Sequence, residues 1–175
     1  ATFGLDLKHY KPHQKAEPLN SLSFIGALNW MPNEEGLKWF LKEIWPSIHD
    51  KFPSLKFYIA SKEIPKWLTD SATENVELIS DLQHAKDFIT SKSIMVVPLK
   101  SGSGIRIKII EGMALGKAII STTIGAEGIN YTDGENILIA DRKEEFLAQI
   151  SLCMDDQNFI KSIGKKARKT AEEDH

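Results

Sequence analysis

Hydrophobic residues in this chain fall into short continuous runs separated by longer segments with helical spacing. Short runs bounded by polar or turn residues are typical of buried strands. Six such runs predict strands at 22–28, 55–60, 76–79, 93–97, 118–121 and 136–139. The segments between and after them predict helices at 34–50, 64–68, 83–90, 104–115, 143–154 and 159–172. Strands that alternate with helices in this way favour an α/β fold: a Rossmann-like, doubly wound parallel sheet of about six strands, with helices on both faces.

The first predicted helix carries two local signals. Asn33 precedes it and can cap its free N–H groups, which is the interpretation we favour over a role in ligand binding. Pro46 lies near its end and is expected to kink it. Trp39 and Trp45 fall on its apolar stripe and are therefore expected in the core.

A Gly/Ser loop follows the fourth predicted strand and leads into the fourth predicted helix. Gly102 and Gly104 permit a tight turn, and Ser101 and Ser103 supply hydroxyl groups. The first N–H groups of a helix have no internal partner and carry partial positive charge, so they attract anions. Taken alone, these residues fit two interpretations equally well: a phosphate site, or a tight turn in which Ser103 caps the helix.

Other small or polar residues also follow predicted strands. Gly26 lies near the end of the first, and Ser80 and Asp81 follow the third. Doubly wound sheets bind ligands beyond the carboxyl ends of their strands, so one cleft is expected to gather these residues and the Gly/Ser loop. Asp81 can equally do no more than cap the helix that follows it.

The segment around the loop resembles a known family. It reads Pro98-Leu-Lys-Ser-Gly-Ser-Gly-Ile-Arg-Ile-Lys-Ile-Ile-Glu-Gly-Met-Ala-Leu-Gly116. This is similar to the donor-binding loop and helix of retaining glycosyltransferases with the two-domain GT-B fold, glycosyltransferase family 4 or glycosyl transferases group 1. The similarity continues through 117–122 and 124–129, and 4–12 resembles that family's interdomain segment. The matching residues are Gly102, Gly104, Arg106, Lys108, Ile109, Glu111, Met113, Ala114 and Gly116.

The resemblance implies a role for each candidate residue. Glu111 would accept hydrogen bonds from the ribose hydroxyls of a nucleotide-sugar, and Lys108 and Arg106 would neutralise its diphosphate. Each has an alternative: Glu111 paired with Lys108 on a solvated helix surface, and Arg106 facing solvent in the first helical turn. The whole implied donor site consists of Gly102, Ser103, Gly104, Arg106, Lys108, Glu111, Gly26, Ser80 and Asp81.

The implied reaction transfers a sugar, with retention, from a UDP-, GDP- or ADP-sugar to an acceptor, without a cofactor or a metal. The sequence agrees, since it has no Asp-x-Asp pair and its five His residues show no metal-ligand spacing. Two positions depart from the family pattern. Ser103 stands where many members have a sugar-binding Glu, and Ala27 where many have a phosphate-binding Arg. Two alternatives therefore stay open: a nucleotide-sugar epimerase of the same fold, and a degenerate, non-catalytic nucleotide-binding module.

Length and composition limit the number of domains, the partners and the compartment. The 175 residues suit one domain, and their net charge of −2 does not suggest a nucleic-acid partner. The lone Cys153 fits a reducing compartment and is expected to be a small buried hydrophobe. No apolar run approaches the roughly 20 residues of a membrane span. We interpret the chain as the C-terminal half of a GT-B enzyme: 1–20 as interdomain linker and 21–175 as the donor-binding domain.

A missing N-terminal domain would then bind the acceptor and carry any catalytic base. We expect this half alone to bind nucleotide weakly and to catalyse no transfer. A cytoplasmic location is expected for the full-length protein, and peripheral association with the inner face of the membrane stays open.

Overall fold

A six-stranded parallel sheet forms the centre of the computed structural model, which describes residues 5–12, 21–71, 73–80 and 83–174. The strand order is β3-β2-β1-β4-β5-β6, and every neighbouring pair is parallel. This confirms the predicted Rossmann-like doubly wound sheet. The strands are β1 Ser21–Ile25, β2 Lys56–Ala60, β3 Val76–Ile79, β4 Ile94–Val97, β5 Ala118–Ser121 and β6 Leu138–Ile139.

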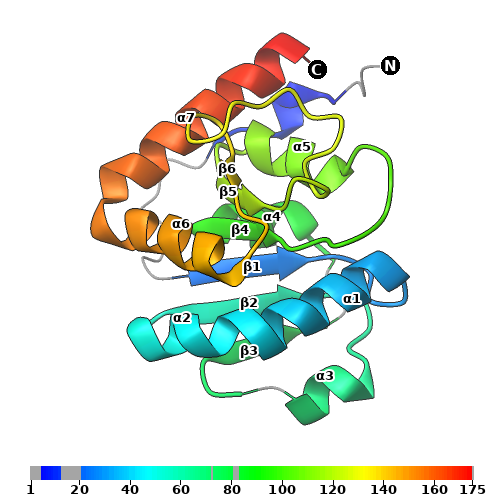
Figure 1. Ribbon diagram of the computed structural model, residues 1–175. Helices are drawn as coiled ribbons and strands as arrows, with labels where there is room; N and C mark the ends of the chain where they lie inside the picture. The colour runs from blue at the N-terminus through cyan, green and yellow to red at the C-terminus, as the bar shows by residue number, and fades with distance from the viewer. Residues whose placement is uncertain (1–4, 13–20, 72, 81–82, 175) are drawn as a thin grey trace.

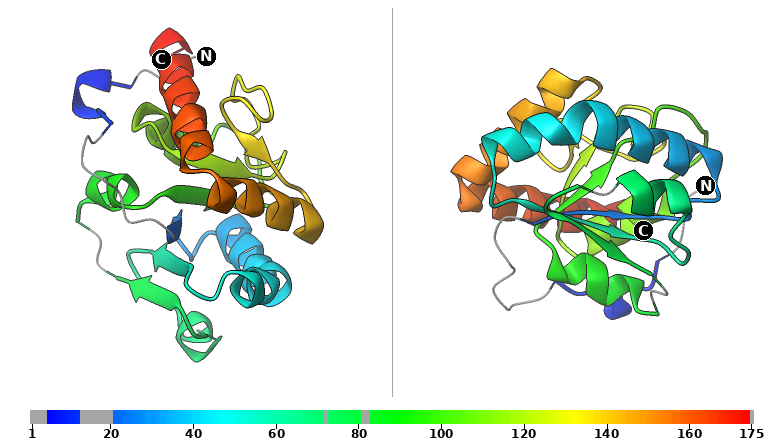
Figure 2. Two further views of the ribbon diagram at one scale, coloured as in Figure 1. Left: turned by 90° about the vertical axis from the view of Figure 1, so that its left-hand side faces the viewer. Right: turned by 90° about the horizontal axis from the view of Figure 1, so that it is seen from below.

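Helices cover both faces of the sheet (Figures 1 and 2). One face carries α1 Met31–Trp39, the π-helical turn η2 Phe40–Ile44, α2 Trp45–Lys51 and α6 Lys143–Asp155. The other carries α4 Ala85–Ser91 and α5 Ile107–Ala114, with α7 Gln157–Asp174 packed against α5. Two short elements remain, α3 Lys66–Ser71 and the 3-10 turn η1 Leu7–His9.

Each face of the sheet has its own apolar core. Under α1, α2 and α6, the ring of Phe40 lies edge-on to Phe57 and Phe146, with ring centroids 5.1 and 5.5 Å apart. Trp45 is fully buried there, as expected, whereas Trp39 is only partly buried at the margin. Burial of β4 and β5 on both faces explains why their sequences are continuous apolar runs rather than alternating ones.

The start of α1 differs from the prediction. The helix begins at Met31, with Trp30 as its N-cap residue and Pro32 in its first turn, where the missing N–H of proline is not needed. Asn33 lies inside the helix, and its side-chain amide donates a hydrogen bond of 3.0 Å to the carbonyl of Ala27. The predicted capping role of Asn33 is therefore wrong, because the proline moves the helix start three residues earlier and leaves Asn33 to close the loop after β1.

The predicted distortion at Pro46 is present as a π-helical turn. The N–H of Trp45 bonds to the carbonyl of Phe40, five residues earlier, instead of four. In a regular helix the ring of Pro46 would meet the carbonyl of Lys42, so a widened turn just before the proline relieves that contact. The helix therefore continues into α2 rather than ending.

Cys153 is fully buried on α6, as expected, and burial raises the pKa of its thiol from 9.0 to about 12. Because the folded-state pKa is the higher one, the stability linked to the protonated thiol is complete below pH 9 and is lost as the pH rises toward 12. Between pH 8 and pH 10 the protein is expected to lose about 1.4 kcal/mol more stability than the Cys153→Ala variant. Urea unfolding of both proteins at the two pH values measures this difference. Equal losses would contradict it.

Among the described residues, no helix is both long enough and apolar enough to cross a bilayer.

Candidate functional site

A cavity of about 300 Å³ opens at the carboxyl ends of β1 and β4. The chain builds the sheet outward from β1 to β3 on one side and from β4 to β6 on the other. The two strands thus meet at the topological switch point, where such sheets bind ligands. Polar groups reach the cavity from the loop after β1, the start of α1 and the first turn of α5: Gly26, Asn33, Arg106 and Lys108.

Thr122, which follows β5, holds the beginning of the Gly/Ser loop. The Thr122 hydroxyl donates a hydrogen bond to the carbonyl of Leu99 at 2.5 Å. The same hydroxyl accepts a hydrogen bond from the N–H of Gly125 at 2.9 Å. Farther along, Gly102 and Gly104 have φ values of +106° and +88°, which side-chain-bearing residues rarely adopt. Because these positive φ values are incompatible with a right-handed helix, α5 starts later than its predicted start at Gly104. It begins at Ile107, and no side chain caps its first N–H groups.

Arg106 is the N-cap residue of α5, and its side chain is only 9% exposed. Its Nη1 donates to the carbonyl of Gly104 and lies 3.8 Å from Glu127 Oε2. Its Nε and Nη2 are buried without a hydrogen-bond partner among the described residues, as is Ser101 Oγ nearby. The alternative of a solvent-facing Arg106 is therefore wrong. Buried polar groups without partners are costly. Because Arg106 also lines the cavity, a ligand bound there could supply the partners that its two nitrogens lack.

Lys108 and Glu111 form the ion pair that their spacing predicts, with 3.0 Å between Lys108 Nζ and Glu111 Oε2. Lys108 is 41% exposed and Glu111 only 15%. The pair exists, but Glu111 does not lie on an open helix surface. Its second oxygen, Oε1, accepts a hydrogen bond of 3.3 Å from the hydroxyl of Tyr10.

The other predicted residues are spread around this cavity. Gly26 lies against Asn33, where a Cβ would come 2.8 Å from the amide nitrogen. Gly102, Ser103 and Gly104 are exposed on the loop. Ser80 lines a separate cavity of about 420 Å³ beside α4, and Asp81 lies outside the described residues. The structure thus brings Gly26, Arg106 and Lys108 together, and it places Ser80 and Glu111 outside the lining of this cavity.

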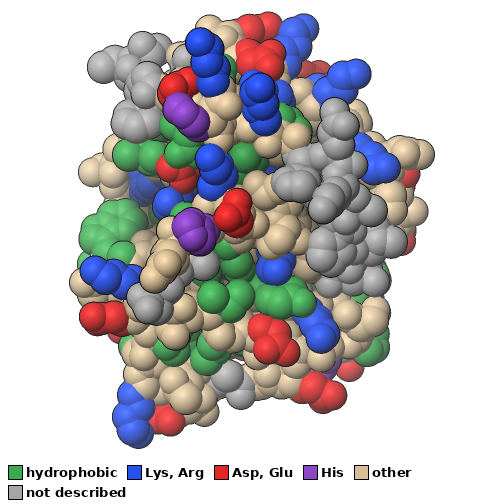
Figure 3. Space-filling model, turned by 180° about the vertical axis from the view of Figure 1, so that it is seen from behind, with side chains coloured by type: hydrophobic (Ala, Val, Ile, Leu, Met, Phe, Trp, Pro, Cys, Tyr) green, Lys and Arg blue, Asp and Glu red, His purple; other side chains and the backbone are tan. Residues whose placement is uncertain are grey.

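Exposed apolar side chains mark the same edge of the sheet. Trp30 is 42% exposed and lines the cavity, and Met31, Ile105, Ile107 and Ile124 are also exposed. Figure 3, seen from behind, shows hydrophobic side chains at the surface on this edge, beside Lys and Arg. Apolar surface around a cavity that a few polar groups enter is typical of a face that another domain or a ligand covers.

Tyr10 is the residue that sequence reasoning missed. It lies in a polar segment before the first strand, and its partner Glu111 is 101 positions away. Its hydroxyl was the signal in the sequence for such a contact, since a tyrosine that is partly buried usually finds a hydrogen-bond partner.

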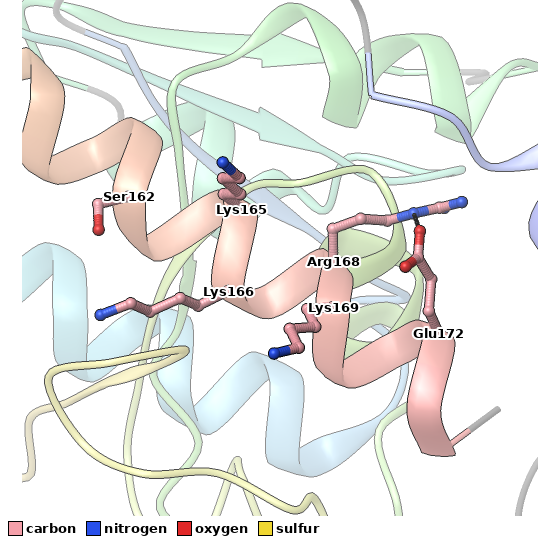
Figure 4. Close-up of a pocket in the computed structure, with 6 residues that line it drawn as sticks. All are labelled: Ser162, Lys165, Lys166, Arg168, Lys169 and Glu172. Atoms are coloured by element: carbon pink, nitrogen blue, oxygen red, sulfur yellow. Dashed lines mark hydrogen bonds and ion pairs between the residues drawn. The ribbon is translucent and has the colours of Figure 1, made fainter.

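A larger cavity, about 760 Å³, runs along α7 (Figure 4). The described residues that line it all come from that helix, and three of them are lysines. Figure 4 shows the lysine side chains pointing in different directions and Arg168 joined to Glu172. A ligand site needs polar groups that converge, so the cavity between β1 and β4 is the better candidate. In the part of the chain that the structure describes, no cluster of three His, Cys, Asp or Glu residues could hold a metal ion.

The sheet order and the arrangement of its helices define a Rossmann-like domain of the kind found as the C-terminal half of GT-B proteins. The sequence profile of the glycosyl transferases group 1 family matches residues 20–156. The chain belongs to this family.

Several known proteins are similar to this chain in sequence or in fold. An uncharacterized 44.6 kDa protein in the cps region of Klebsiella pneumoniae is 29% identical over 140 residues, which are 73% of this chain and 35% of that protein. The C-terminal domain of LpcC, a glycosyl transferase group 1 family protein from Francisella tularensis, has a TM-score of 0.77 at 14% identity, and the match covers 97% of both chains. HepE of Anabaena, solved with UDP-glucose, has a TM-score of 0.78 at 13% identity, over 98% of this chain and 51% of HepE. The chain thus spans about a third of the Klebsiella protein and half of HepE.

Proposed function

We propose that the chain is the donor-binding half of a family 4 glycosyltransferase that transfers a sugar, with retention, from a nucleoside-diphosphate sugar to an acceptor. In this proposal residues 21–175 bind the donor, 1–20 link the two halves, and an N-terminal domain binds the acceptor. The lengths of the similar proteins support a second domain, since this chain spans only part of them. A cytoplasmic location and peripheral membrane association stay predictions.

The observation that carries the proposal is the guanidinium of Arg106. Two of its nitrogen atoms are buried without a partner, at the uncapped N-terminus of α5. An anion in the cavity would accept hydrogen bonds from both nitrogens and would benefit from the positive end of the helix. A diphosphate has the charge and the number of oxygens to use these donors together with Lys108.

In this proposal the same groups replace the arginine that many members of the family have after β1. Ala27 occupies the position where many members of the family have an arginine. Arg106, Lys108 and the helix N-terminus together would stabilise the negative charge that develops on a departing nucleoside diphosphate. The charge would come from the protein, in keeping with the metal-independent transfer that the resemblance implies.

UDP is the first nucleotide to test. HepE was solved with UDP-glucose, and the pneumococcal O-GlcNAc transferase GtfA, with a TM-score of 0.73 at 14% identity, with UDP and GlcNAc. The cavity lies where the fold places a ligand, and the neighbouring cavity that Ser80 lines could hold the base. Glu111 would accept hydrogen bonds from the ribose.

Calorimetric titration of UDP, GDP and ADP into the 175-residue chain tests the proposal. At least one nucleotide is expected to bind with a Kd at or below about 1 mM. A preference among the three identifies the donor nucleotide. If none binds at millimolar concentration, the proposal fails and a degenerate module is favoured.

A further inference from the structure

The carboxylate of Glu111 is held from two sides. Lys108, one turn earlier on the same helix, donates to Oε2 at 3.0 Å. The hydroxyl of Tyr10, from the segment before the first strand, donates to Oε1 at 3.3 Å. A glutamate on a helix surface normally samples several rotamers, and two donors on opposite oxygens select one of them.

Tyr10 is itself fixed in place. Its carbonyl accepts a hydrogen bond from Arg168 Nη1 on α7, a nitrogen that also donates to the carbonyl of Ala114 at 2.8 Å. Lys86 of α4 donates to the carbonyl of His9 at 2.7 Å, and its Nζ lies 5.4 Å from the centre of the Tyr10 ring. Contacts from α4 and α7 therefore hold the hydroxyl next to α5.

The ring of Tyr10 also lies on the side where the base is expected. It packs on a small apolar cluster that contains Phe88, with Ile79 packed against the same cluster. Phe88 and Ile79 line the cavity of about 420 Å³ to which Ser80 belongs. Tyr10 thus connects Glu111 with the wall of that second cavity.

Glu111 keeps the capacity to bind a ligand. An ionised carboxylate offers about four acceptor sites, and Tyr10 and Lys108 use two. The remaining two suit two adjacent hydroxyl groups. Burial, and then the negative charge of Glu111, raise the pKa of Tyr10 above its ordinary value of 10.0, so at neutral pH its hydroxyl stays protonated and remains a donor.

We propose that Tyr10 is a positioning residue of the ribose site, whose hydroxyl fixes the Glu111 carboxylate in the orientation that accepts the two ribose hydroxyls. The inference rests on the proposed function, because it requires Glu111 to bind ribose. It extends the donor site beyond 21–175 into the segment that precedes it. The contribution would be specific for the ribose, since the Tyr10 hydroxyl bonds to Glu111, which does not line the cavity between β1 and β4.

The test compares UDP with 2′,3′-dideoxy-UDP, which lacks both ribose hydroxyls, in calorimetric titrations of the 175-residue chain. Tyr10→Phe keeps the ring and removes only the hydroxyl. We expect it to weaken UDP binding about three- to tenfold, the effect of one lost hydrogen bond of ordinary strength, and to change dideoxy-UDP binding less than about twofold. Tyr131→Phe, in the loop before β6, is the matched control and should change neither affinity.

A double-mutant cycle distinguishes an effect through Glu111 from a merely structural role of Tyr10. In a Glu111→Gln background, Tyr10→Phe should weaken UDP binding by less than about twofold, because the group that it orients is gone. Equal weakening of UDP and dideoxy-UDP would overturn the inference, and so would unchanged UDP binding by Tyr10→Phe. If the unmodified chain binds none of UDP, GDP and ADP, the proposed function fails and the inference fails with it.

Discussion

Replacing Gly164 with alanine is expected to lower the free energy of unfolding by about 2 kcal/mol or more. An added Cβ would lie 2.0 Å from the carbonyl oxygen of Gly116 and 2.9 Å from its carbonyl carbon. Both atoms are backbone, so α7 would have to move away from the end of α5. Helix propensity alone favours alanine over glycine by about 1 kcal/mol, so the two effects predict changes of opposite sign.

Gly116 cannot easily yield, because it ends α5. Its φ is +71°, and its N–H bonds to the carbonyl of Met113, while the N–H of Lys117 bonds to that of Gly112. These bonds satisfy carbonyls at the helix end. Displacing α7 would also disturb Arg168, which bonds to the carbonyls of Ala114 and Tyr10.

Urea unfolding followed by circular dichroism measures the change. Ser162→Ala is the matched control, since Ser162 is exposed on the same helix. It should change stability by no more than about 0.5 kcal/mol. If Gly164→Ala proves as stable as that control, the close packing of α7 on the α5 terminus is refuted.

The second large effect is expected at Arg106. Arg106→Met keeps the length of the side chain and removes its charge and donors, so nucleotide binding should weaken about 10- to 100-fold through lost charged hydrogen bonds. Stability without ligand should stay the same or rise, because unpartnered buried donors are replaced by an apolar group. Opposite changes in binding and stability distinguish a ligand-binding arginine from a structural one.

Calorimetry with the best-binding nucleotide and urea unfolding without ligand provide both measurements. Arg142→Met serves as the control, because Arg142 is exposed and pairs with Glu145 at the start of α6. It is expected to leave affinity and stability nearly unchanged. Unchanged nucleotide binding by Arg106→Met, or a clear loss of stability, would contradict the proposed role.

The sequence predicted the sheet well because both faces of its central strands are buried. Continuous apolar runs such as Ile94–Val97 and Ala118–Ser121 leave little ambiguity about a parallel α/β sheet. Helix starts were less predictable, since they depend on the backbone conformation of the residues just before the helix. Pro32 moved the start of α1 earlier than predicted, and the positive φ of Gly104 moved the start of α5 later.

The candidate site was predictable where its groups are close in sequence. Lys108 and Glu111 are three residues apart on one helix, so their contact follows from helical geometry. The burial of Arg106 depends on tertiary packing around the Gly/Ser loop, and the contact of Tyr10 joins residues 101 positions apart. Local pattern contains no information about such contacts.

The position of β1 in the sheet also bears on how the protein folds. Leu22 of β1 pairs with Ile94 of β4, which is 72 positions away, whereas β2 and β3 pair across a much shorter stretch of chain. Loop-closure entropy favours short-range pairing first, so β1–β3 and β4–β6 are expected to collapse as two separate units. The cavity between β1 and β4 exists only after these units join. Nucleotide-binding competence should therefore appear in the last, slowest phase of refolding, after most helical structure has formed.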